Sequence, residues 1–319
     1  MKVIPLLTAL LGTLVISTGA LAQSWPTKPV RLLVSFPAGA PGDIVARVIQ
    51  PELQKELGQP VIVENRPGAG GNIGASEVVR ASDQHTFLVG PDTMATINPH
   101  LYKKMGFNPL EDLKPITHLI MFNQMLVCHP GAQIKNLAEL SAKSKAQSMN
   151  YASGGPGVPG HMGMEMLLAA TGMKMIHVPY KGPGPAMQDV LAGHVPCGFL
   201  AAPAVGPMAR GGKLVALGVS GTRRSPGSPD VPTMAQLGVK DFDASFFEVM
   251  LAPKSTPPAI VERMSKAVTK ILQQADVRAK LLGGDMEPVG NTPGESLKRL
   301  QADNQKWGRV ADQIGLQLD

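Results

Sequence analysis

The sequence predicts an α/β fold of two lobes, in which each lobe is a mainly parallel sheet flanked by helices. Three observations support this prediction. The chain has 319 residues, a length that suits two domains. Short apolar runs alternate with segments whose apolar residues recur every three or four positions, which is typical of strands followed by helices. The alternation occurs in two consecutive stretches, so we expect two units with a mobile cleft between them.

The composition supports a folded protein and argues against nucleic-acid binding. Hydrophobic residues make up 44% and charged residues 17%, enough apolar surface to bury a full core. The net charge is +6, but lysine and arginine cluster only in pairs such as Lys103-Lys104, and aromatic residues are 4%. Nucleic-acid binding is therefore not expected. A solvated basic surface accounts for the charge, and attraction of anionic ligands remains the alternative.

The N-terminus has the pattern of a secretory signal peptide. Lys2 precedes a nearly uncharged, apolar run over residues 3–20, and residues 20–22 read Ala-Leu-Ala, a small-x-small cleavage site. We therefore expect cleavage after Ala22 and export to the periplasm. An uncleaved membrane anchor is the alternative, although Pro5 and Gly12 interrupt the apolar run.

The first unit begins directly after this segment. An apolar strand is expected at 30–35, followed by a turn-rich loop and a helix that Asp43 opens as its N-cap. Pro51 is expected to kink this helix, and Gly58 to end it. The next expected elements are a strand at 61–63, a helix at 73–81 and a strand at 87–89.

The second unit repeats the alternation after residue 120. Expected strands lie at 125–129, 149–152, 176–179, 195–200 and 214–219. Expected helices lie at 137–145, 161–171 and 185–192. Residues 221–232 read as a linker, and the last part is expected to be mainly helical, with helices at 258–274 and 293–314.

The two cysteines leave two interpretations open. Cys128 and Cys197 each lie in an apolar run, a pattern that favours free, buried cysteines packed as small hydrophobic residues. An exported protein is also in an oxidising compartment, where the two could pair.

Two loops predict a site for an anion. Loop 36–43 carries Gly39 and Gly42 just before a helix, and loop 153–160 repeats this arrangement with Ser153 adding a hydroxyl. Glycines allow backbone N–H groups to approach a ligand, and helix N-termini favour negative charge. Ligands of open α/β sheets bind beyond the carboxyl ends of strands, where loops 36–43, 90–98 and 153–161 all lie.

Signals for catalysis, metals and cofactors are absent from the sequence. It has no G-x-S-x-G elbow and no H-E-x-x-H motif. His161 and Glu165 could share a metal, but two ligands do not make a site, and His161 is expected to bond backbone at its helix start. Residues 67–74 match no nucleotide-binding loop, and their glycines are interpreted as turn residues. We expect no metal and no cofactor.

A series of ordered motifs resembles a known family. The resemblance covers about residues 25–315 and rests on Phe-Pro-Ala-Gly at 36–39, on Val-Glu-Asn-Arg-Pro-Gly-Ala-Gly-Gly at 63–71 and on Asn-Pro-His-Leu-Tyr at 98–102. Tyr-Ala-Ser at 151–153, His-Val-Pro-Tyr-Lys-Gly at 177–182, Asp-Val-Pro-Thr at 230–233 and Leu-Ala-Pro at 251–253 complete it. These motifs are similar to those of the extracytoplasmic solute receptors of tripartite tricarboxylate transporters, the TctC or Bug family.

The resemblance implies a two-lobed periplasmic binding protein of the Venus-flytrap form. One lobe would hold residues 23–122 plus 225–319, and the other residues 123–224. The receptor would be a monomer that captures a small carboxylate (a di- or tricarboxylate, an amino acid or an aromatic acid) for a membrane permease or a sensor. The implied ligand-binding residues are Ala38, Gly39, Ala40 and Asp43 in one lobe, Ser153, Gly155, Gly157 and His161 in the other, and Asp92, Thr93 and Met94 at a third loop.

Departures from the family pattern are also visible. Ala40 stands where a second glycine is usual, and residues 83–86 replace a common Asp-Gly-Tyr-Thr turn. Phe246-Phe247-Glu248 replaces an aromatic-x-Gly pattern, which is expected to alter a wall of the cleft. Two other functions remain open: a secreted hydrolase-like enzyme on the same fold, with His161 near Ser153 as base, and an interaction module with a vestigial cleft.

Overall fold

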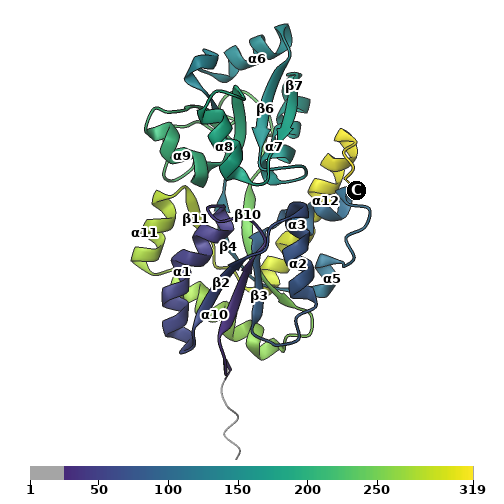
Figure 1. The fold of residues 1–319 in the computed structure, drawn as a ribbon, viewed down its shortest axis with the longest axis vertical. Coiled ribbons are helices and arrows are strands. Elements are labelled where there is room, and N and C mark those ends of the chain that lie inside the picture. Colours follow the sequence, from purple (N-terminus) through teal and green to yellow (C-terminus); the bar gives the residue numbers. More distant parts are fainter. Residues whose placement is uncertain (1–24, 319) are drawn as a thin grey trace, which may run out of the picture.

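The computed structural model describes residues 25–318, which form two lobes stacked end to end (Figure 1). Within this part of the chain, the first lobe contains a six-stranded sheet and the second a five-stranded sheet. The expected signal peptide at 1–22 lies outside the described residues. No helix among residues 25–318 is long and apolar enough to cross a membrane.

The first lobe is built from two separate stretches of the chain. Its strand order is β11-β4-β10-β3-β1-β2. The strands are β1 (Val30–Val34), β2 (Val61–Asn65), β3 (Thr86–Pro91), β4 (Leu113–Phe122), β10 (Phe246–Pro253) and β11 (Met286–Pro288). The helices are α1 (Pro41–Leu57), α2 (Asn72–Val79), α3 (Thr93–Thr96), α4 (Asn98–Leu101), α5 (Pro109–Asp112), α10 (Pro258–Leu272), α11 (Ala275–Gly283) and α12 (Pro293–Ile314), with a 3₁₀ turn at Ala69–Gly71.

The second lobe is continuous in sequence and has the strand order β7-β6-β8-β5-β9. Its strands are β5 (Gln124–Cys128), β6 (Met149–Ser153), β7 (Met175–Pro179), β8 (Cys197–Ala201) and β9 (Val215–Val219). Its helices are α6 (Leu137–Ala146), α7 (Pro159–Thr171), α8 (Pro183–Leu191) and α9 (Ala202–Arg210), with a 3₁₀ turn at Pro130–Ala132.

The sheets are mixed rather than mainly parallel, which corrects the expectation from sequence. In the first lobe β1 pairs in parallel with β2 and β3, but β10 runs antiparallel to β3 and β4, and β11 runs antiparallel to β4. In the second lobe β6 pairs in parallel with β7 and β8, whereas β5 is antiparallel to β8 and β9. In the first lobe, β10 and β11 belong to the part of the chain that returns from the second lobe; in the second lobe, the antiparallel strand β5 is the first strand after the crossing.

The N-cap of helix α1 lies three residues earlier than expected. Ala40 is its N-cap residue and Pro41 its first residue, so Asp43 lies within the first turn and is not the N-cap. Helices α7 and α8 also begin at proline, two residues before the expected starts at 161 and 185. Proline is favoured in the first turn of a helix, since its fixed φ suits the helix and its missing N–H would have no partner there.

The two lobes are joined at Asn123 and again by residues 220–245. Asn123 Nδ2 donates to the carbonyl of Arg223 and to Ser225 Oγ, each at 3.0 Å. The Gln124 N–H donates to Ser220 Oγ at 2.8 Å, and this hydroxyl donates to the Ala244 carbonyl at 2.7 Å. These hydrogen bonds tie the two crossings together.

The exact lobe boundaries stay a prediction. Val219 forms an isolated bridge with Thr233, and the Val219 N–H donates to the carbonyl of Pro232 at 2.9 Å. This segment, which the sequence assigned to the first lobe after residue 224, therefore packs on the edge of the second sheet.

The two cysteines form a disulfide, so the interpretation favoured from sequence was wrong. Cys128 on β5 faces Cys197 on β8 in the antiparallel register, and their sulfurs are bonded. Because α6, β6, α7, β7 and α8 lie between β5 and β8 in the chain, the apolar sequence around each cysteine could not reveal this neighbour.

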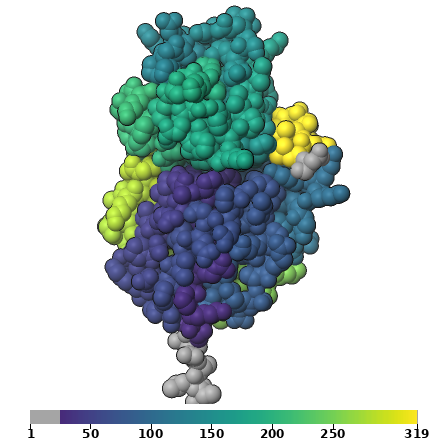
Figure 2. Space-filling model, in the orientation of Figure 1, coloured from purple at the N-terminus to yellow at the C-terminus, as the bar shows by residue number. Residues whose placement is uncertain are grey.

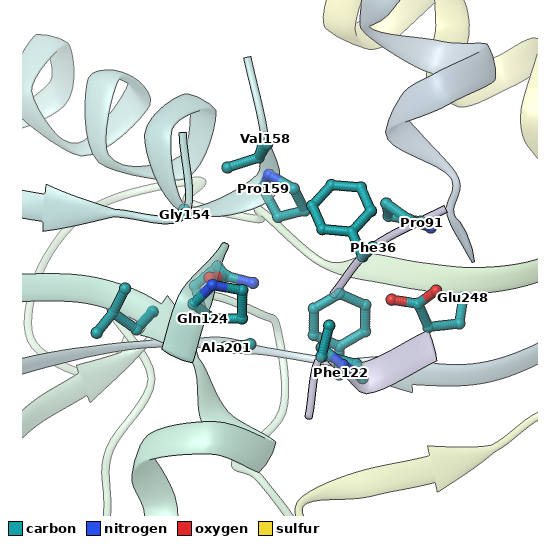
Figure 3. A pocket seen from close by; sticks show the side chains of 14 residues that line it. Phe36, Pro91, Phe122, Gln124, Gly154, Val158, Pro159, Ala201 and Glu248 are labelled. Carbon is teal, nitrogen blue, oxygen red and sulfur yellow. The ribbon is translucent and has the colours of Figure 1, made fainter. Parts of the chain in front are cut away.

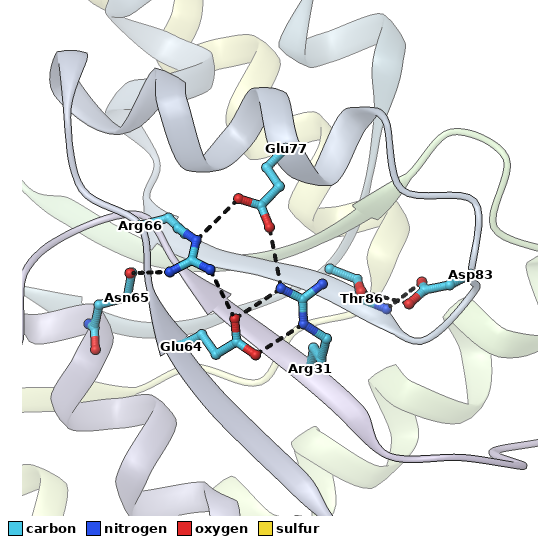
Figure 4. Close-up of polar contacts among 7 residues, drawn as sticks. All are labelled: Arg31, Glu64, Asn65, Arg66, Glu77, Asp83 and Thr86. Atoms are coloured by element: carbon cyan, nitrogen blue, oxygen red, sulfur yellow. Dashed lines mark hydrogen bonds and ion pairs between the residues drawn. The ribbon is translucent and has the colours of Figure 1, made fainter.

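A cluster of charged side chains joins β1, β2 and α2 in the first lobe (Figure 4). Arg31 on β1 pairs with Glu64 on β2 at 2.9 Å and with Glu77 on α2 at 3.3 Å. Arg66 bonds the same two carboxylates, at 3.5 and 3.3 Å. These half-exposed ion pairs add little stability individually, but they fix the start of the loop that follows Arg66.

Candidate functional site

A small cavity lies at the junction of the two lobes and is lined by residues from both. Its volume is about 30 Å³, room for one or two water molecules. Figure 3 shows Phe36, Pro91, Phe122 and Glu248 from the first lobe facing residues of the second lobe across it. We call this the inner cavity; its full lining is Phe36, Ala40, Pro41, Pro91, Phe122, Gln124, Gly154, Val158, Pro159, Gly160, Pro183, Leu200, Ala201 and Glu248.

Four helices among residues 25–318 start at the wall of the inner cavity. Ala40 and Pro41 begin α1, Val158 to Gly160 begin α7, Pro183 begins α8, and Ala201 is the N-cap residue of α9. None of these four N-termini has a side-chain cap. Each helix end carries unpaired N–H groups and about half a positive charge. Their convergence makes the inner cavity attractive to an anion without any lysine or arginine in its wall.

The loop before α1 is held by its own side chains. The Gly39 N–H donates to Asp43 Oδ2 at 3.0 Å, and Gly39 has a φ of 82°, a conformation that glycine adopts without strain. Asp43 Oδ1 also accepts from Arg47 Nε at 2.9 Å and from Asn65 Nδ2 at 3.0 Å. Of the predicted residues in this loop, Ala40 lines the inner cavity, whereas Ala38, Gly39 and Asp43 line neither cavity described here.

The loop before α7 is also held internally. Ser153 is fully buried; its Oγ donates to the Gly155 carbonyl at 3.1 Å and accepts from the Gly155 N–H at 3.2 Å. The Gly157 N–H donates to His161 Nδ1 at 3.0 Å, which confirms that His161 bonds backbone at its helix start. Gly155 reaches a cavity wall, but Ser153, Gly157 and His161 do not. The Ser153 hydroxyl therefore shapes the loop.

A stack of three rings supports this loop from behind. The His177 ring lies between those of His161 and Tyr151, with centroid distances of 3.9 and 5.1 Å. His177 Nε2 lies 2.6 Å from Ser153 Oγ, and Tyr151 donates to Glu165 Oε1 at 2.7 Å. Burial lowers the pKa of His161 to about 3 and that of His177 to about 4. Both imidazoles are therefore neutral at physiological pH.

The third predicted group lies behind the cleft wall. Asp92, Thr93 and Met94 are buried, and none of them lines either cavity. Met94 packs beneath the loop at Gly71, where a Cβ would come within 2.8 Å of its sulfur. Both carboxyl oxygens of Asp92 lack a hydrogen-bond partner, and burial raises its pKa well above the ordinary value.

A larger cavity of about 640 Å³ adjoins the inner one, and the two share Phe36, Gly154 and Val158. We call it the outer cavity. Residues 67–71, whose glycines the sequence indicated only as turn residues, form one of its walls. Its full lining is Ser35, Phe36, Pro37, Pro67, Gly68, Ala69, Gly70, Gly71, Tyr102, Gly154, Gly155, Pro156, Val158, Tyr180, Lys181, Gly182 and Leu318.

The space-filling view shows the two lobes in contact on the face it presents (Figure 2). Part of this contact lies beside the outer cavity, where a Cβ on Gly182 of the second lobe would come within 3.0 Å of the Pro37 ring of the first. The inner cavity is too small for an organic acid in this arrangement, so a ligand requires the lobes to separate.

Several cavity residues were not predicted from sequence as site residues. They include Phe122 and Gln124 at the lobe crossing, Glu248 on β10, and Tyr180 with Lys181 after β7. Two signals were present: residues 177–182 belong to the motif series, and Glu248 stands at a departure from the family pattern. Among the described residues, no cluster of three or more histidines, cysteines, aspartates or glutamates could hold a metal.

Comparisons with known proteins agree with this architecture. Residues 45–316 match the tripartite tricarboxylate transporter family receptor. The protein BugT of Bordetella pertussis is 33% identical over 320 residues, covering 98% of each chain. A solved structure of an R. palustris protein with adipate has a TM-score of 0.88 at 29% identity, covering 92% of this chain and 99% of that one.

A second solved structure is MatC from Rhodopseudomonas palustris with bound malate. Its TM-score is 0.83 at 30% identity, covering 90% of this chain and 99% of that one. The match covers most of the chain and includes both lobes, as the ordered motifs implied. The chain belongs to the tripartite tricarboxylate transporter family of receptors, the TctC or Bug family.

Proposed function

We propose that this receptor captures a small organic acid between its lobes in the periplasm and presents it to a membrane permease or a sensor. The observation that carries the proposal is the convergence of four uncapped helix N-termini on the inner cavity. Backbone N–H groups at such ends hold a carboxylate by charge-assisted hydrogen bonds. The adipate and malate bound by two structural relatives are carboxylates too.

The location and working state follow from the same proposal. Residues 1–22 direct export and are removed after Ala22, so the mature receptor works outside the cytoplasm. We propose that it works there as a monomer. The cleft opens to admit the ligand, and the lobes then close on it less tightly than here, because the inner cavity is too small for an organic acid while Pro37 and Gly182 lie this close.

A hydrolase is the second candidate, because His177 Nε2 lies at hydrogen-bonding distance from Ser153 Oγ, as in a nucleophile–base pair. Two observations argue against it. Ser153 is fully buried and lines neither cavity, and its hydroxyl is engaged by the Gly155 backbone. We therefore propose a loop-positioning role for the pair, and no catalysis.

Isothermal titration calorimetry on the mature protein tests the proposal. The panel contains mono-, di- and tricarboxylates, amino acids and aromatic acids, each checked by chromatography for turnover after incubation. Binding of at least one acid without turnover is expected. Turnover would support the hydrolase instead. If the folded protein neither binds nor turns over any acid of the panel, both functions would be overturned. Native mass spectrometry of protein purified without denaturation identifies an acid that is retained from the cell.

A further inference from the structure

Glu248 places a buried carboxyl group in the wall of the inner cavity, and one oxygen of this group has no hydrogen-bond partner. It lies on β10, every residue of which is buried, and 2% of Glu248 itself is exposed. Its Oε2 atom has no hydrogen-bond partner. Figure 3 shows the carboxyl group directed toward Phe36 and Pro91 across the cavity. Burying a carboxyl oxygen without a hydrogen-bond donor costs free energy. A donor group on the ligand would therefore offset this cost when the ligand binds.

The surroundings of Glu248 supply no cationic side chain. No lysine or arginine among residues 25–318 forms an ion pair with it, and Asp92 is a second buried carboxyl close by. Burial raises the pKa of Glu248 well above its ordinary value, Asp92 raises it further, and the N–H of Gly42 opposes the shift. The carboxyl lies over the first turn of α1, since a Cβ on Gly42 would come within 2.7 Å of Glu248 Oε2.

The inner cavity therefore has two unlike poles. The second lobe contributes the N-termini of α7, α8 and α9, which favour a carboxylate. The first lobe contributes α1, whose N-terminus already faces the Glu248 carboxyl. A ligand with two carboxylates would bring its second negative charge toward Glu248 and Asp92. A ligand with a carboxylate and an ammonium group would match both poles.

We propose that Glu248 determines specificity, and that the ligand of this receptor is a zwitterion whose ammonium group donates to the Glu248 carboxyl. This inference rests on the proposed function, because the carboxylate of the same ligand binds the helix N-termini of the second lobe. An ammonium group at hydrogen-bonding distance favours the ionised carboxyl. Binding is therefore accompanied by proton release wherever the free receptor holds Glu248 protonated.

The test compares acids that differ only in the amino group. Calorimetry is run with alanine against propionate, glutamate against glutarate, and phenylalanine against 3-phenylpropionate, three pairs that span the size of the side chain. For the parent protein we expect at least one amino acid to bind ten-fold or more tightly than its deamino partner. Titrations in two buffers of different ionisation enthalpy report the proton released.

Glu248→Gln and Glu248→Gly are the variants, and Glu111→Gln, at an exposed position on α5, is the matched control. Both Glu248 variants are expected to lose the preference for the amino acid by ten-fold or more and to release no proton, while the deamino acid binds as well as before or better. Circular dichroism and a thermal melt confirm folding, and the two variants with different side-chain volumes separate charge from packing.

The outcomes distinguish this inference from the proposed function. A parent protein that binds acids but prefers the deamino partners, or folded variants that keep the parent's preference, would overturn the role of Glu248 alone. A parent protein that binds none of the six compounds nor any acid of the wider panel would overturn both.

Discussion

Arg210 Nη1 lies 2.7 Å from Asp285 Oδ2, an ion pair that joins the two lobes outside the cleft. Arg210 ends α9 in the second lobe, and Asp285 lies between α11 and β11 in the first. The same guanidinium nitrogen donates to the Gly227 carbonyl and to Ser228 Oγ, at 2.9 and 2.8 Å. Asp285 is fully buried, whereas Arg210 is half-exposed, so the two partners have unequal access to water.

This inequality predicts unequal losses of stability. Arg210→Ala leaves a buried carboxylate without its cation and is expected to lower the free energy of unfolding by about 2–3 kcal/mol. Asp285→Asn is expected to cost about 1 kcal/mol, since Arg210 can turn toward solvent. Urea unfolding followed by circular dichroism measures both, with Arg309→Ala, at an exposed position, as control. Equal losses from the two substitutions would contradict this account.

The buried Glu248 carboxyl predicts a stability that depends on pH. An ordinary glutamate has a pKa of 4.5, and burial raises the pKa of Glu248 well above it. The folded state therefore holds more protons than the unfolded state above pH 4.5, and this residue lowers the stability as the pH rises. Glu248→Gln removes that loss, so the melting temperature of the variant minus that of the parent should grow from pH 4.5 to pH 8. A difference that shrinks over this range would refute the assignment.

Ser153→Ala tests whether the hydroxyl shapes the loop before α7. The substitution removes the bonds of Ser153 Oγ to the Gly155 backbone and to His177. Affinity for the carboxylate identified by the calorimetric panel is expected to fall about 10-fold, or ~1.4 kcal/mol. The fall is modest because the helix N-termini remain. Ser148→Ala, at an exposed position, is the control. An unchanged affinity in the folded variant would show that this loop does not need the hydroxyl.

The disulfide predicts sensitivity to reductant. Cys128 and Cys197 are separated by 69 residues in sequence. Closing a loop of this length restricts the unfolded chain, which typically adds about 2–4 kcal/mol of stability. Reduction should therefore lower the melting temperature of the parent protein. The double variant Cys128→Ala with Cys197→Ala should melt at the lower temperature with or without reductant. A reduced protein, verified by thiol titration, that melts like the oxidised one would contradict the prediction.

The predicted cleavage of the signal peptide can be tested by sequencing the N-terminus of the exported protein. We expect the mature chain in the periplasmic fraction to begin at Gln23, because residues 20–22 form a small-x-small site. N-terminal sequencing of that material checks the position. An intact Met1 recovered in the membrane fraction would favour an uncleaved anchor.

Local patterns predicted the strands and helices that depend on near neighbours. β1 was expected at 30–35 and runs from Val30 to Val34, and the helix expected at 293–314 is α12. The antiparallel strands β10 and β11 were missed, because β10 lies in the C-terminal part that was read as mainly helical. Their pairing with β3 and β4 depends on a return of the chain to the first lobe, and no local pattern encodes that return.

The sequence indicated which loops line the candidate site, but it did not indicate which side chains reach the cavities. The strand-to-helix loops at 36–43 and 153–160 both reach the cleft through Ala40, Gly154 and Gly155. The hydroxyl and carboxyl groups that the sequence placed there, on Ser153 and Asp43, instead bond the loops themselves. Sequence order could not show that four helices point at one cavity.

The use of helix ends as the anion-binding groups has a consequence for how such receptors diversify. A backbone N–H persists through any substitution except to proline, so the capacity to hold a carboxylate is protected from most single mutations. The side chains of Phe36, Phe122, Gln124 and Glu248 in the cavity wall are free to vary. After gene duplication, copies of this fold can therefore acquire new ligands by changing a few side chains in the cavity wall. The backbone N–H groups that bind the carboxylate stay the same.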